Sequence, residues 1–122
     1  MARILVVDDD QNISEIVQYI AKMAGYEILV AANGREGLEQ AKSGKPDLII
    51  LDIMMPEMDG FTLHNQLLAD EATKRIPIII LTAKGQMRDS FLGSSNVKFY
   101  MDKPFEPQSL RENIRIALQG KQ

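Results

Sequence analysis

Five polar residues of this sequence stand directly after, or close after, its short apolar runs. Asp8 and Asp9 follow the run "ILVV", and Asp52 follows "LIIL". Thr82 follows "IIIL", and Lys103 comes two residues after the weaker run "VKFYM". Taken singly, the threonine could bond to the backbone at a strand end and the lysine could be a surface charge. Together, three carboxylates, a hydroxyl and an ammonium group could bind a hard cation next to a phosphate oxygen.

The apolar runs are the elements that must position these residues. Short continuous runs rich in Ile and Val are typical of strands buried on both faces of a parallel sheet. Helical periodicity alternates with the runs, which predicts right-handed βαβ units and an α/β fold with a doubly wound, five-stranded parallel sheet. We expect strands at 4–7, 26–32, 48–51, 78–81 and 97–101, and helices near 13–24, 34–42, 61–68, 86–95 and 107–119.

The five polar residues should share the carboxyl edge of this sheet. Doubly wound folds bind ligands at that edge, where the strand order reverses. In the flavodoxin-like order 2-1-3-4-5 the reversal lies between the first and third strands, so Asp8, Asp9 and Asp52 should converge. Two carboxylates about 4 Å apart repel by roughly 4 kcal/mol at an effective dielectric of 20. Three aspartates and Lys103 leave a formal charge of −2, and hard oxygen ligands favour Mg²⁺ over zinc or copper as the ion that neutralises it.

Composition narrows the class of protein. The chain has 122 residues, a formal net charge of −3 and no cysteine. We expect one domain over 1–122, either stand-alone or excised from a longer protein, in the cytoplasm, without membrane insertion or direct nucleic-acid binding. Asp10 is expected to cap the first helix. The single histidine, His64, is expected on the solvated face of its helix, far from the carboxyl edge.

Four segments carry a resemblance to a known family: "ILVVDDD", "ANGREGLEQAKSGKPDLIILDIMMPEMDGF", "IPIIILTAKG" and "YMDKPF". Over essentially the whole chain they resemble the receiver domain of two-component response regulators. The resemblance implies a phosphorylation-activated signalling switch, a regulatory domain rather than an enzyme. Its implied partners are a histidine kinase or phosphotransfer protein, and a downstream output domain or target protein.

The resemblance also implies a role for each acidic residue at the edge. Asp52 would accept the phosphoryl group. Asp9 and Asp52 would ligate Mg²⁺ directly, together with the backbone carbonyl of Met54, and Asp8 would act on the ion through water. The first two acids of the "DDD" triplet would therefore serve the metal, whereas the third serves the helix.

Three further residues have implied roles around the phosphoryl group. Thr82 would bond one of its oxygens and Lys103 would pair with its charge. Tyr100 matches the switch aromatic of the family, although a tyrosine at this position could also simply pack on the sheet. Movement of Thr82 and Tyr100 after phosphorylation would change the surface that a partner recognises.

Two other functions are compatible with parts of the pattern. One is a receiver-like interaction module that works without phosphate, against which the intact acidic and basic set argues. The other is a Mg²⁺-dependent phosphatase with an aspartyl nucleophile, which would require an acid two residues after Asp52. That position is Met54, so the usual acid–base group of such enzymes is missing.

One stretch departs from the common pattern of the family, and two further positions bear on the lifetime of the phosphoryl group. Ser95, Asn96 and Val97 stand where Ala-Gly-Ala is common, and asparagine tolerates a left-handed backbone better than most residues. Met54 and Lys84 occupy the positions that flank the approach of water to the phosphoryl group. Neither side chain can orient an attacking water and accept its proton, so the resemblance predicts a long-lived aspartyl phosphate.

Overall fold

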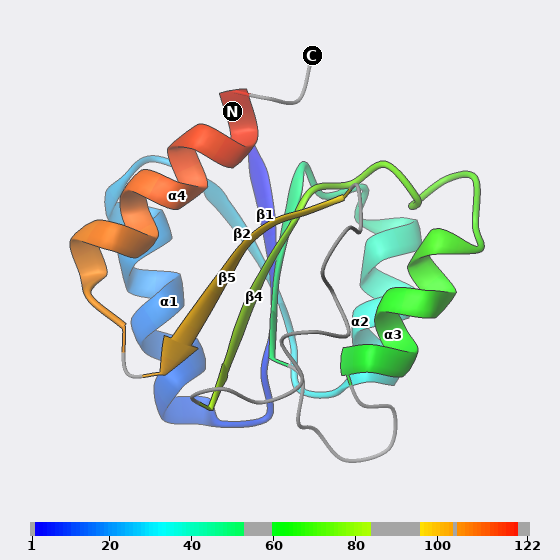
Figure 1. The fold of residues 1–122 in the computed structure, drawn as a ribbon, viewed down its shortest axis with the longest axis horizontal. Coiled ribbons are helices and arrows are strands. Elements are labelled where there is room, and N and C mark those ends of the chain that lie inside the picture. The colour runs from blue at the N-terminus through cyan, green and yellow to red at the C-terminus, as the bar shows by residue number, and fades with distance from the viewer. Residues whose placement is uncertain (1, 53–59, 84–95, 104, 120–122) are drawn as a thin grey trace.

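The chain forms a five-stranded parallel sheet with helices on both faces in a computed structural model, which describes residues 2–52, 60–83, 96–103 and 105–119 (Figure 1). The strand order is β2-β1-β3-β4-β5, so the predicted flavodoxin-like fold is confirmed and the order reverses between β1 and β3. The strands are β1 (Arg3–Val7), β2 (Glu27–Ala31), β3 (Leu48–Asp52), β4 (Ile78–Ala83) and β5 (Val97–Lys103).

Four helices cover the sheet in the described part of the chain. On one face lie α1 (Gln11–Met23) and α4 (Pro107–Gln119), and on the other lie α2 (Gly34–Ser43) and α3 (Gly60–Leu68) (Figure 1). The helix expected at 86–95 lies outside the described residues. Within those residues, no helix combines the length and the apolar composition that crossing a membrane requires.

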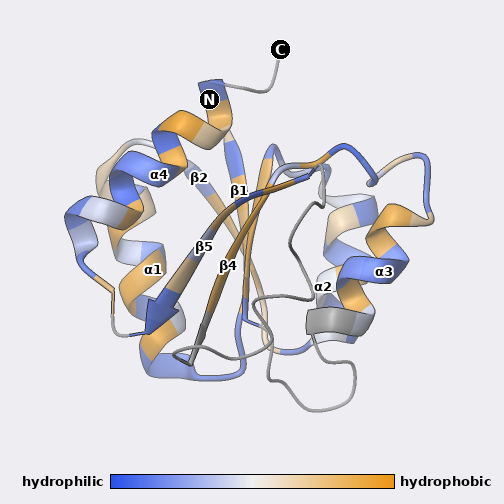
Figure 2. Cartoon of the chain, viewed as in Figure 1, coloured by the Kyte–Doolittle hydropathy of each residue, from blue (hydrophilic) through white to orange (hydrophobic). Residues whose placement is uncertain are grey.

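The core has two layers because successive strand residues point to opposite faces of the sheet. Leu5 and Val7 of β1 belong to the cluster that packs under α2 and α3. Ile4 and Val6 belong to the cluster that packs under α1 and α4. Figure 2 shows the apolar residues of the strands between the two helical layers. Burial on both sides explains why β1, β3 and β4 read as continuous apolar runs rather than as alternating patterns.

Local side-chain contacts set the ends of the first two helices. Asp10 caps α1, since its Oδ1 accepts hydrogen bonds from the N–H groups of Asn12 at 3.0 Å and Ile13 at 3.2 Å. Asn33 caps α2 in the same way, accepting from the N–H of Glu36 at 2.9 Å. Gly25, just after α1, has a φ of 94°, a left-handed backbone that glycine adopts without a steric cost. The predicted capping role of Asp10 is confirmed.

The prediction that His64 faces solvent is wrong. His64 is 5% exposed, and its Nε2 lies 3.1 Å from Oδ1 of Asn96, which is also buried. The buried stripe of α3 includes Leu63 and Leu67, and His64 lies on the same side of this short helix. Its partner is 32 residues further along the chain, so local periodicity could not reveal the contact. Asn96 does not adopt a left-handed backbone in the structure.

Candidate functional site

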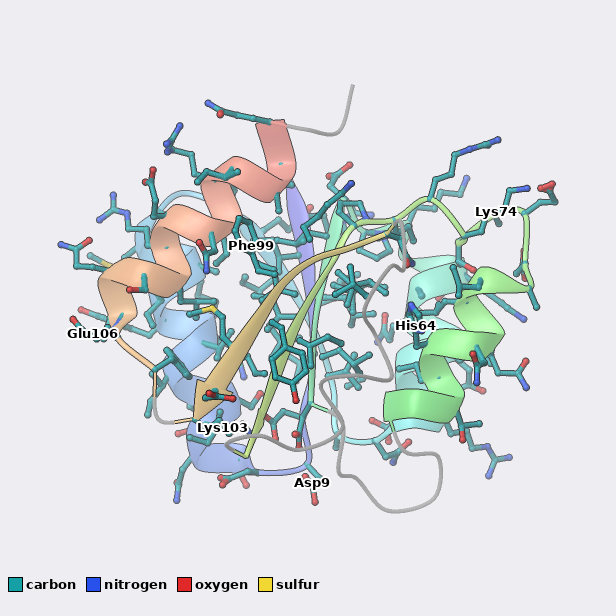
Figure 3. The ribbon with its side chains drawn as sticks, viewed as in Figure 1. Asp9, His64, Lys74, Phe99, Lys103 and Glu106 are labelled. Carbon is teal, nitrogen blue, oxygen red and sulfur yellow. The ribbon has the colours of Figure 1, made fainter. Side chains whose placement is uncertain are left out.

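The carboxyl edge of the sheet brings together side chains from three strands. Asp8 directly follows β1, Asp52 is the last residue of β3, and Lys103 is the last residue of β5. β1 and β3 are neighbours, so Asp8 and Asp52 end adjacent strands at the same level of the sheet. β5 extends two residues past its predicted end, so Lys103 belongs to the strand itself. Figure 3 shows Asp9 and Lys103 at this end of the molecule.

Three carboxylates form a compact cluster at this edge. Asp8, Asp9 and Asp52 each place one carboxylate oxygen so that all three oxygens lie within 4.8 Å of one another. Asp8 and Asp52 are 4% and 5% exposed, whereas Asp9 is open to solvent. Oxygens bound to one Mg²⁺ lie about 2.1 Å from the ion, and therefore roughly 3–4 Å from one another. The cluster thus has close to the dimensions of a site for one small divalent cation.

Among the described residues, Lys103 partly balances the charge of the cluster. The Nζ of Lys103 lies 3.2 Å from Oδ2 of Asp8 and 3.5 Å from Oδ1 of Asp52. Its ammonium group therefore bridges the ends of β1 and β3 from the end of β5. Three carboxylates and one ammonium still leave an excess of negative charge in a largely buried place, which makes the site receptive to a cation.

The environment of Asp8 shows how unfavourable this concentration of charge is. Burial raises the pKa of Asp8 above its ordinary value, and the charge of Asp9 raises it further. The N–H of Asp10, 2.9 Å from Oδ1, and the ammonium of Lys103 stabilise the carboxylate and lower the pKa. Burial is the largest of these effects, so the net direction is upward. A cation bound here would compensate for the lost hydration of the carboxylate.

Comparisons with known proteins agree with this arrangement. Residues 4–115 match the family described as "Response regulator receiver domain". The chain belongs to this family. It is a signalling domain of two-component systems, a switch activated by phosphorylation, and its role is regulatory rather than catalytic.

The relatives of this receiver domain include both long and short regulators. It is 42% identical to the "DNA-binding dual master transcriptional regulator RpaA" of Synechocystis sp. over 97% of this chain, but it spans only 49% of RpaA. It is 36% identical to the "Protein PilH" of Pseudomonas aeruginosa over 98% of this chain and 100% of PilH. The solved structure of the chemotaxis response regulator CheY4 of Vibrio cholerae superposes with a TM-score of 0.86 at 33% identity, covering 96% of this chain and 98% of that one.

The structure describes some of the other predicted site residues of the receiver domain. Thr82 lies in β4, opposite Asp102 of β5, one residue before the strand ends. Tyr100, in β5, is half-buried and packs against the core cluster under α2 and α3. Met54 lies outside the described residues. The structure thus brings Asp8, Asp9, Asp52 and Lys103 together, with Thr82 on the adjoining strand.

Polar residues of α1 join the site and were missed by the sequence analysis. A cavity of about 330 Å³ beside Asp8 and Asp9 is also lined by Ser14 and Gln18. Ser14 is buried, and its Oγ accepts a hydrogen bond of 3.0 Å from Nε2 of Gln18. Polar residues in a helix usually face water. Only the position of Ser14 on the buried side of the helical repeat could have indicated that it lines this cavity.

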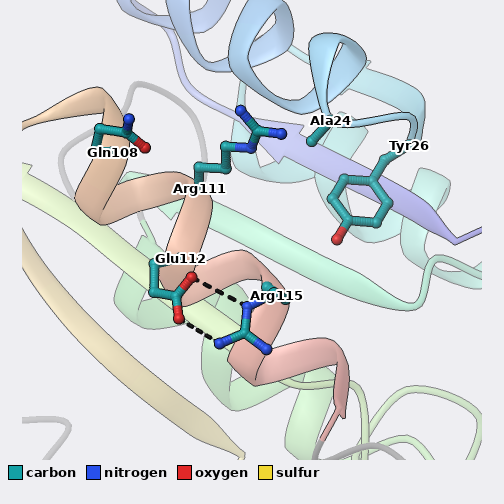
Figure 4. A pocket seen from close by; sticks show the side chains of 6 residues that line it. All are labelled: Ala24, Tyr26, Gln108, Arg111, Glu112 and Arg115. Atoms are coloured by element: carbon teal, nitrogen blue, oxygen red, sulfur yellow. Dashed lines mark hydrogen bonds and ion pairs between the residues drawn. The ribbon is translucent and has the colours of Figure 1, made fainter.

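A different cavity, of about 300 Å³, lies between α4 and the end of α1 (Figure 4). Its lining includes Tyr26 and Arg111, together with Glu112 and Arg115, which form an ion pair along one turn of α4. Among the described residues, this cavity shares no lining residue with the one beside the aspartates. It is therefore a separate feature of the surface rather than part of the site.

Proposed function

We propose that Asp52 accepts a phosphoryl group from the phosphohistidine of a histidine kinase or phosphotransfer protein, with one Mg²⁺ bound at the carboxyl edge. The observation that carries this proposal is the meeting of three aspartates and one lysine from separate strands at the point where the strand order reverses. Burial of two of the aspartates distinguishes the cluster from acidic residues that merely share an exposed surface.

Asp52 is the best candidate for the acceptor because it is buried at the end of a central strand, beside Lys103. Both oxygens of Asp8 have partners, the N–H of Asp10 on Oδ1 and the ammonium of Lys103 on Oδ2. Asp9 is open to water, which would compete for its oxygens. Asp52 is buried at the centre of the edge and is 3.5 Å from Lys103, so its carboxylate is positioned and shielded from solvent.

The proposed reaction moves one phosphoryl group between two nucleophiles. The phosphorus–nitrogen bond of the phosphohistidine breaks as a carboxylate oxygen of Asp52 forms the new phosphorus–oxygen bond, and the imidazole retains the electron pair. Such transfers depend mainly on alignment and on compensation of the charge on the equatorial oxygens. Lys103 supplies one positive charge beside the acceptor. The hydroxyl of Thr82, on the neighbouring strand, would bond a phosphoryl oxygen.

The metal assigned to this site is Mg²⁺. Asp9 and Asp52 would bind it directly, with the backbone carbonyl of Met54, and Asp8 would act through a bound water. The fit rests on the all-oxygen donor set, its spacing and its excess negative charge. Bound Mg²⁺ would supply the charge neutralisation that allows an anionic phosphoryl group to approach three carboxylates.

The output would run through β4 and β5. A phosphoryl group that pulls on Thr82 would change the end of β4, and Tyr100 lies on the adjacent strand. The partner would be an output domain or a separate target protein. Relatives of both lengths make each arrangement a proposal: the chain spans about half of RpaA and all of PilH. We propose that residues 1–122 act as one receiver domain in either case.

Self-phosphorylation by small phosphodonors and slow self-dephosphorylation complete the proposal. Met54 and Lys84, whose structure lies outside the described residues, would leave water without a group that orients it and accepts its proton. The aspartyl phosphate would therefore persist after the donor is removed.

Intact mass spectrometry with acetyl phosphate tests the proposed function. We expect the wild-type protein to gain one phosphoryl group in the presence of Mg²⁺ and to gain none in EDTA. The variant Asp52→Asn should gain none in either condition, whereas the control Asp70→Asn, at the other end of the molecule, should behave as wild type. An equal gain in Asp52→Asn, or a gain in EDTA, would contradict the assignment. Failure of every protein to react would favour a phosphate-independent interaction module.

A further inference from the structure

A pocket at the amino edge of the sheet, at the end remote from the aspartates, has the properties of a second binding site. It is a cavity of about 370 Å³ between the loop that leads into β3 and the turn that leads into β4. We propose that this pocket binds a small phosphate-bearing molecule with a compact flat part, of which a nucleoside monophosphate is the simplest. Figure 3 shows Lys74, the residue before the pocket's Arg75, far from Asp9.

Cations dominate the charge of this pocket. Its lining contains three cationic side chains, those of Lys42, Lys45 and Arg75. Among the described residues, its lining contains one carboxylate, that of Glu71. Glu71 already pairs with a lysine outside the lining, and Lys42 lies 3.5 Å from a carboxylate oxygen of Asp70. In the part of the chain that the structure describes, neither Lys45 nor Arg75 has an ion-pair partner. Two cations are thus available for an anion.

The backbone at Lys45 supports a role for its side chain. Lys45 has a φ of 49°. Among the described residues, no other residue except glycine has a positive φ. Lys45 follows Gly44, the C-cap of α2, at a position where glycine is most common and asparagine next. A residue in such a strained conformation is a reason to look for a function of its side chain. Here the side chain places an ammonium group at the pocket.

The floor of the pocket is apolar and rigid. Pro46 and Ile76 line it, and both are buried. Each lies two residues before a strand of the central sheet, which ties the floor to the core. A ligand that fits both features needs a flat or apolar part against this floor and an anionic part at the cationic rim.

The dipole of α2 explains only part of this arrangement. Cations near a helix C-terminus are stabilised by its partial negative charge, which accounts for Lys42 in the last turn of α2. It does not account for Arg75, which comes from the turn after α3. Arginine presents a planar fork of N–H donors that matches phosphate in a bidentate contact. The combination of two lysines and one arginine from separate segments therefore favours phosphate as the anionic group.

The size of the cavity points to a small molecule. Pockets for small ligands range from about 300 to 1,000 Å³ and are mostly apolar, with a few polar groups that fix orientation. The amino-edge pocket lies at the lower end of this range, enough for one ring system and one phosphate. The proposal is independent of the function proposed for Asp52, because the two sites lie at opposite edges of the sheet.

Isothermal titration calorimetry with defined probes tests the proposal. The probes are AMP and phenyl phosphate, with adenosine and inorganic phosphate as controls that each lack one half of the ligand. EDTA is present throughout, so that a phosphate cannot bind through a metal at the aspartates. We expect AMP, phenyl phosphate or both to bind more tightly than inorganic phosphate, and adenosine to bind weakly or not at all.

Two pocket variants and one matched control locate the binding. Lys45→Gly and Arg75→Ala should each weaken the binding of these probes by about tenfold, since each removes a charge-assisted contact. Lys45→Gly should also leave the melting temperature equal or higher, because glycine adopts a positive φ without strain. Arg111→Ala, an exposed arginine on α4, should leave the affinity unchanged.

Three results would overturn the proposal. The first is the absence of binding by both probes at about 1 mM, an affinity that would provide only about 4 kcal/mol. The second is equal binding of AMP, phenyl phosphate and inorganic phosphate, which would indicate attraction to surface charge alone. The third is wild-type affinity in Lys45→Gly and Arg75→Ala while both variants melt at or above the wild-type temperature.

Discussion

The two edges of the sheet are built on opposite principles. At the carboxyl edge, three carboxylates and one lysine gather with an excess of negative charge, and burial raises the pKa of Asp8. At the amino edge, buried polar groups near the starts of the strands form hydrogen bonds across the fold. The N–H of Ile78 donates to the carbonyl of Asn96 at 2.7 Å, and the side chain of Asn96 meets His64.

This difference separates residues that stabilise the fold from residues that serve binding. Buried polar groups with matched partners contribute to stability, and their removal is costly. Buried charges in excess lower the stability of the free protein and are compensated when a ligand binds. Substitutions at the buried contact between His64 and Asn96 should therefore weaken the fold, whereas some substitutions at the carboxyl edge should strengthen the fold and abolish function.

The largest effect is expected at His64. His64→Ala should lower the free energy of unfolding by about 3 kcal/mol, because it leaves a cavity in the core and removes the hydrogen bond to Oδ1 of Asn96. Urea unfolding measures this change, and Gln66→Ala, exposed on the same helix, is the control. A loss below about 1 kcal/mol would show that the buried contact does not support the amino edge.

At the carboxyl edge the sign should reverse. In EDTA, Asp8→Asn should raise the free energy of unfolding by about 1 kcal/mol, since it removes a buried charge from a cluster that has too many. The same variant should bind Mg²⁺ more weakly. Urea unfolding with EDTA, followed by titration with Mg²⁺, measures both properties. A variant that is less stable than wild type in EDTA would contradict the view that excess buried negative charge destabilises this edge.

The effect of Asp8 should also depend on pH. Its pKa is raised in the folded state, so the folded protein holds the proton at Asp8 more tightly than the unfolded chain does. The stability contributed by this proton is fully present below the unfolded pKa and is lost as the pH rises through the raised folded pKa. In EDTA, the advantage of Asp8→Asn over wild type should therefore grow with increasing pH. A difference that stays constant or shrinks would exclude this linkage.

A smaller effect is expected two residues later in the same acidic triplet. Asp10→Ala should lower the free energy of unfolding by about 1 kcal/mol, because it removes the N-cap of α1. Its affinity for Mg²⁺ should stay close to that of wild type. Measured beside Asp8→Asn, this variant distinguishes an acid that stabilises a helix from one that serves the metal. A large loss of Mg²⁺ affinity would place Asp10 in the site.

The sequence was sufficient to predict features that depend on local pattern. Both faces of β1, β3 and β4 are buried, so the apolar runs alone indicated the strands and, with alternating helices, the fold. The end of each run marked the carboxyl edge, which is why the acidic residues and Lys103 could be grouped before their contacts were known.

Features that depend on contacts distant in the sequence could not be predicted. His64 is buried because Asn96 meets it across the fold, and nothing within α3 indicates that partner. Ile16 follows the helical repeat of α1 but is 47% exposed, because the sheet covers only part of that helix. The pocket around Lys45 and Arg75 joins two loops that are 30 positions apart in the sequence, and only the folded chain brings them together.

The most direct test of the central claim is to locate the phosphoryl group on the protein. After reaction with acetyl phosphate and Mg²⁺, borohydride reduces an aspartyl phosphate to homoserine, and peptide mass spectrometry identifies the converted position. We expect conversion at Asp52 and retention of Asp8, Asp9 and Asp10 as aspartate. Conversion at one of those three residues, or no conversion in a protein that has gained the phosphoryl mass, would contradict the claim.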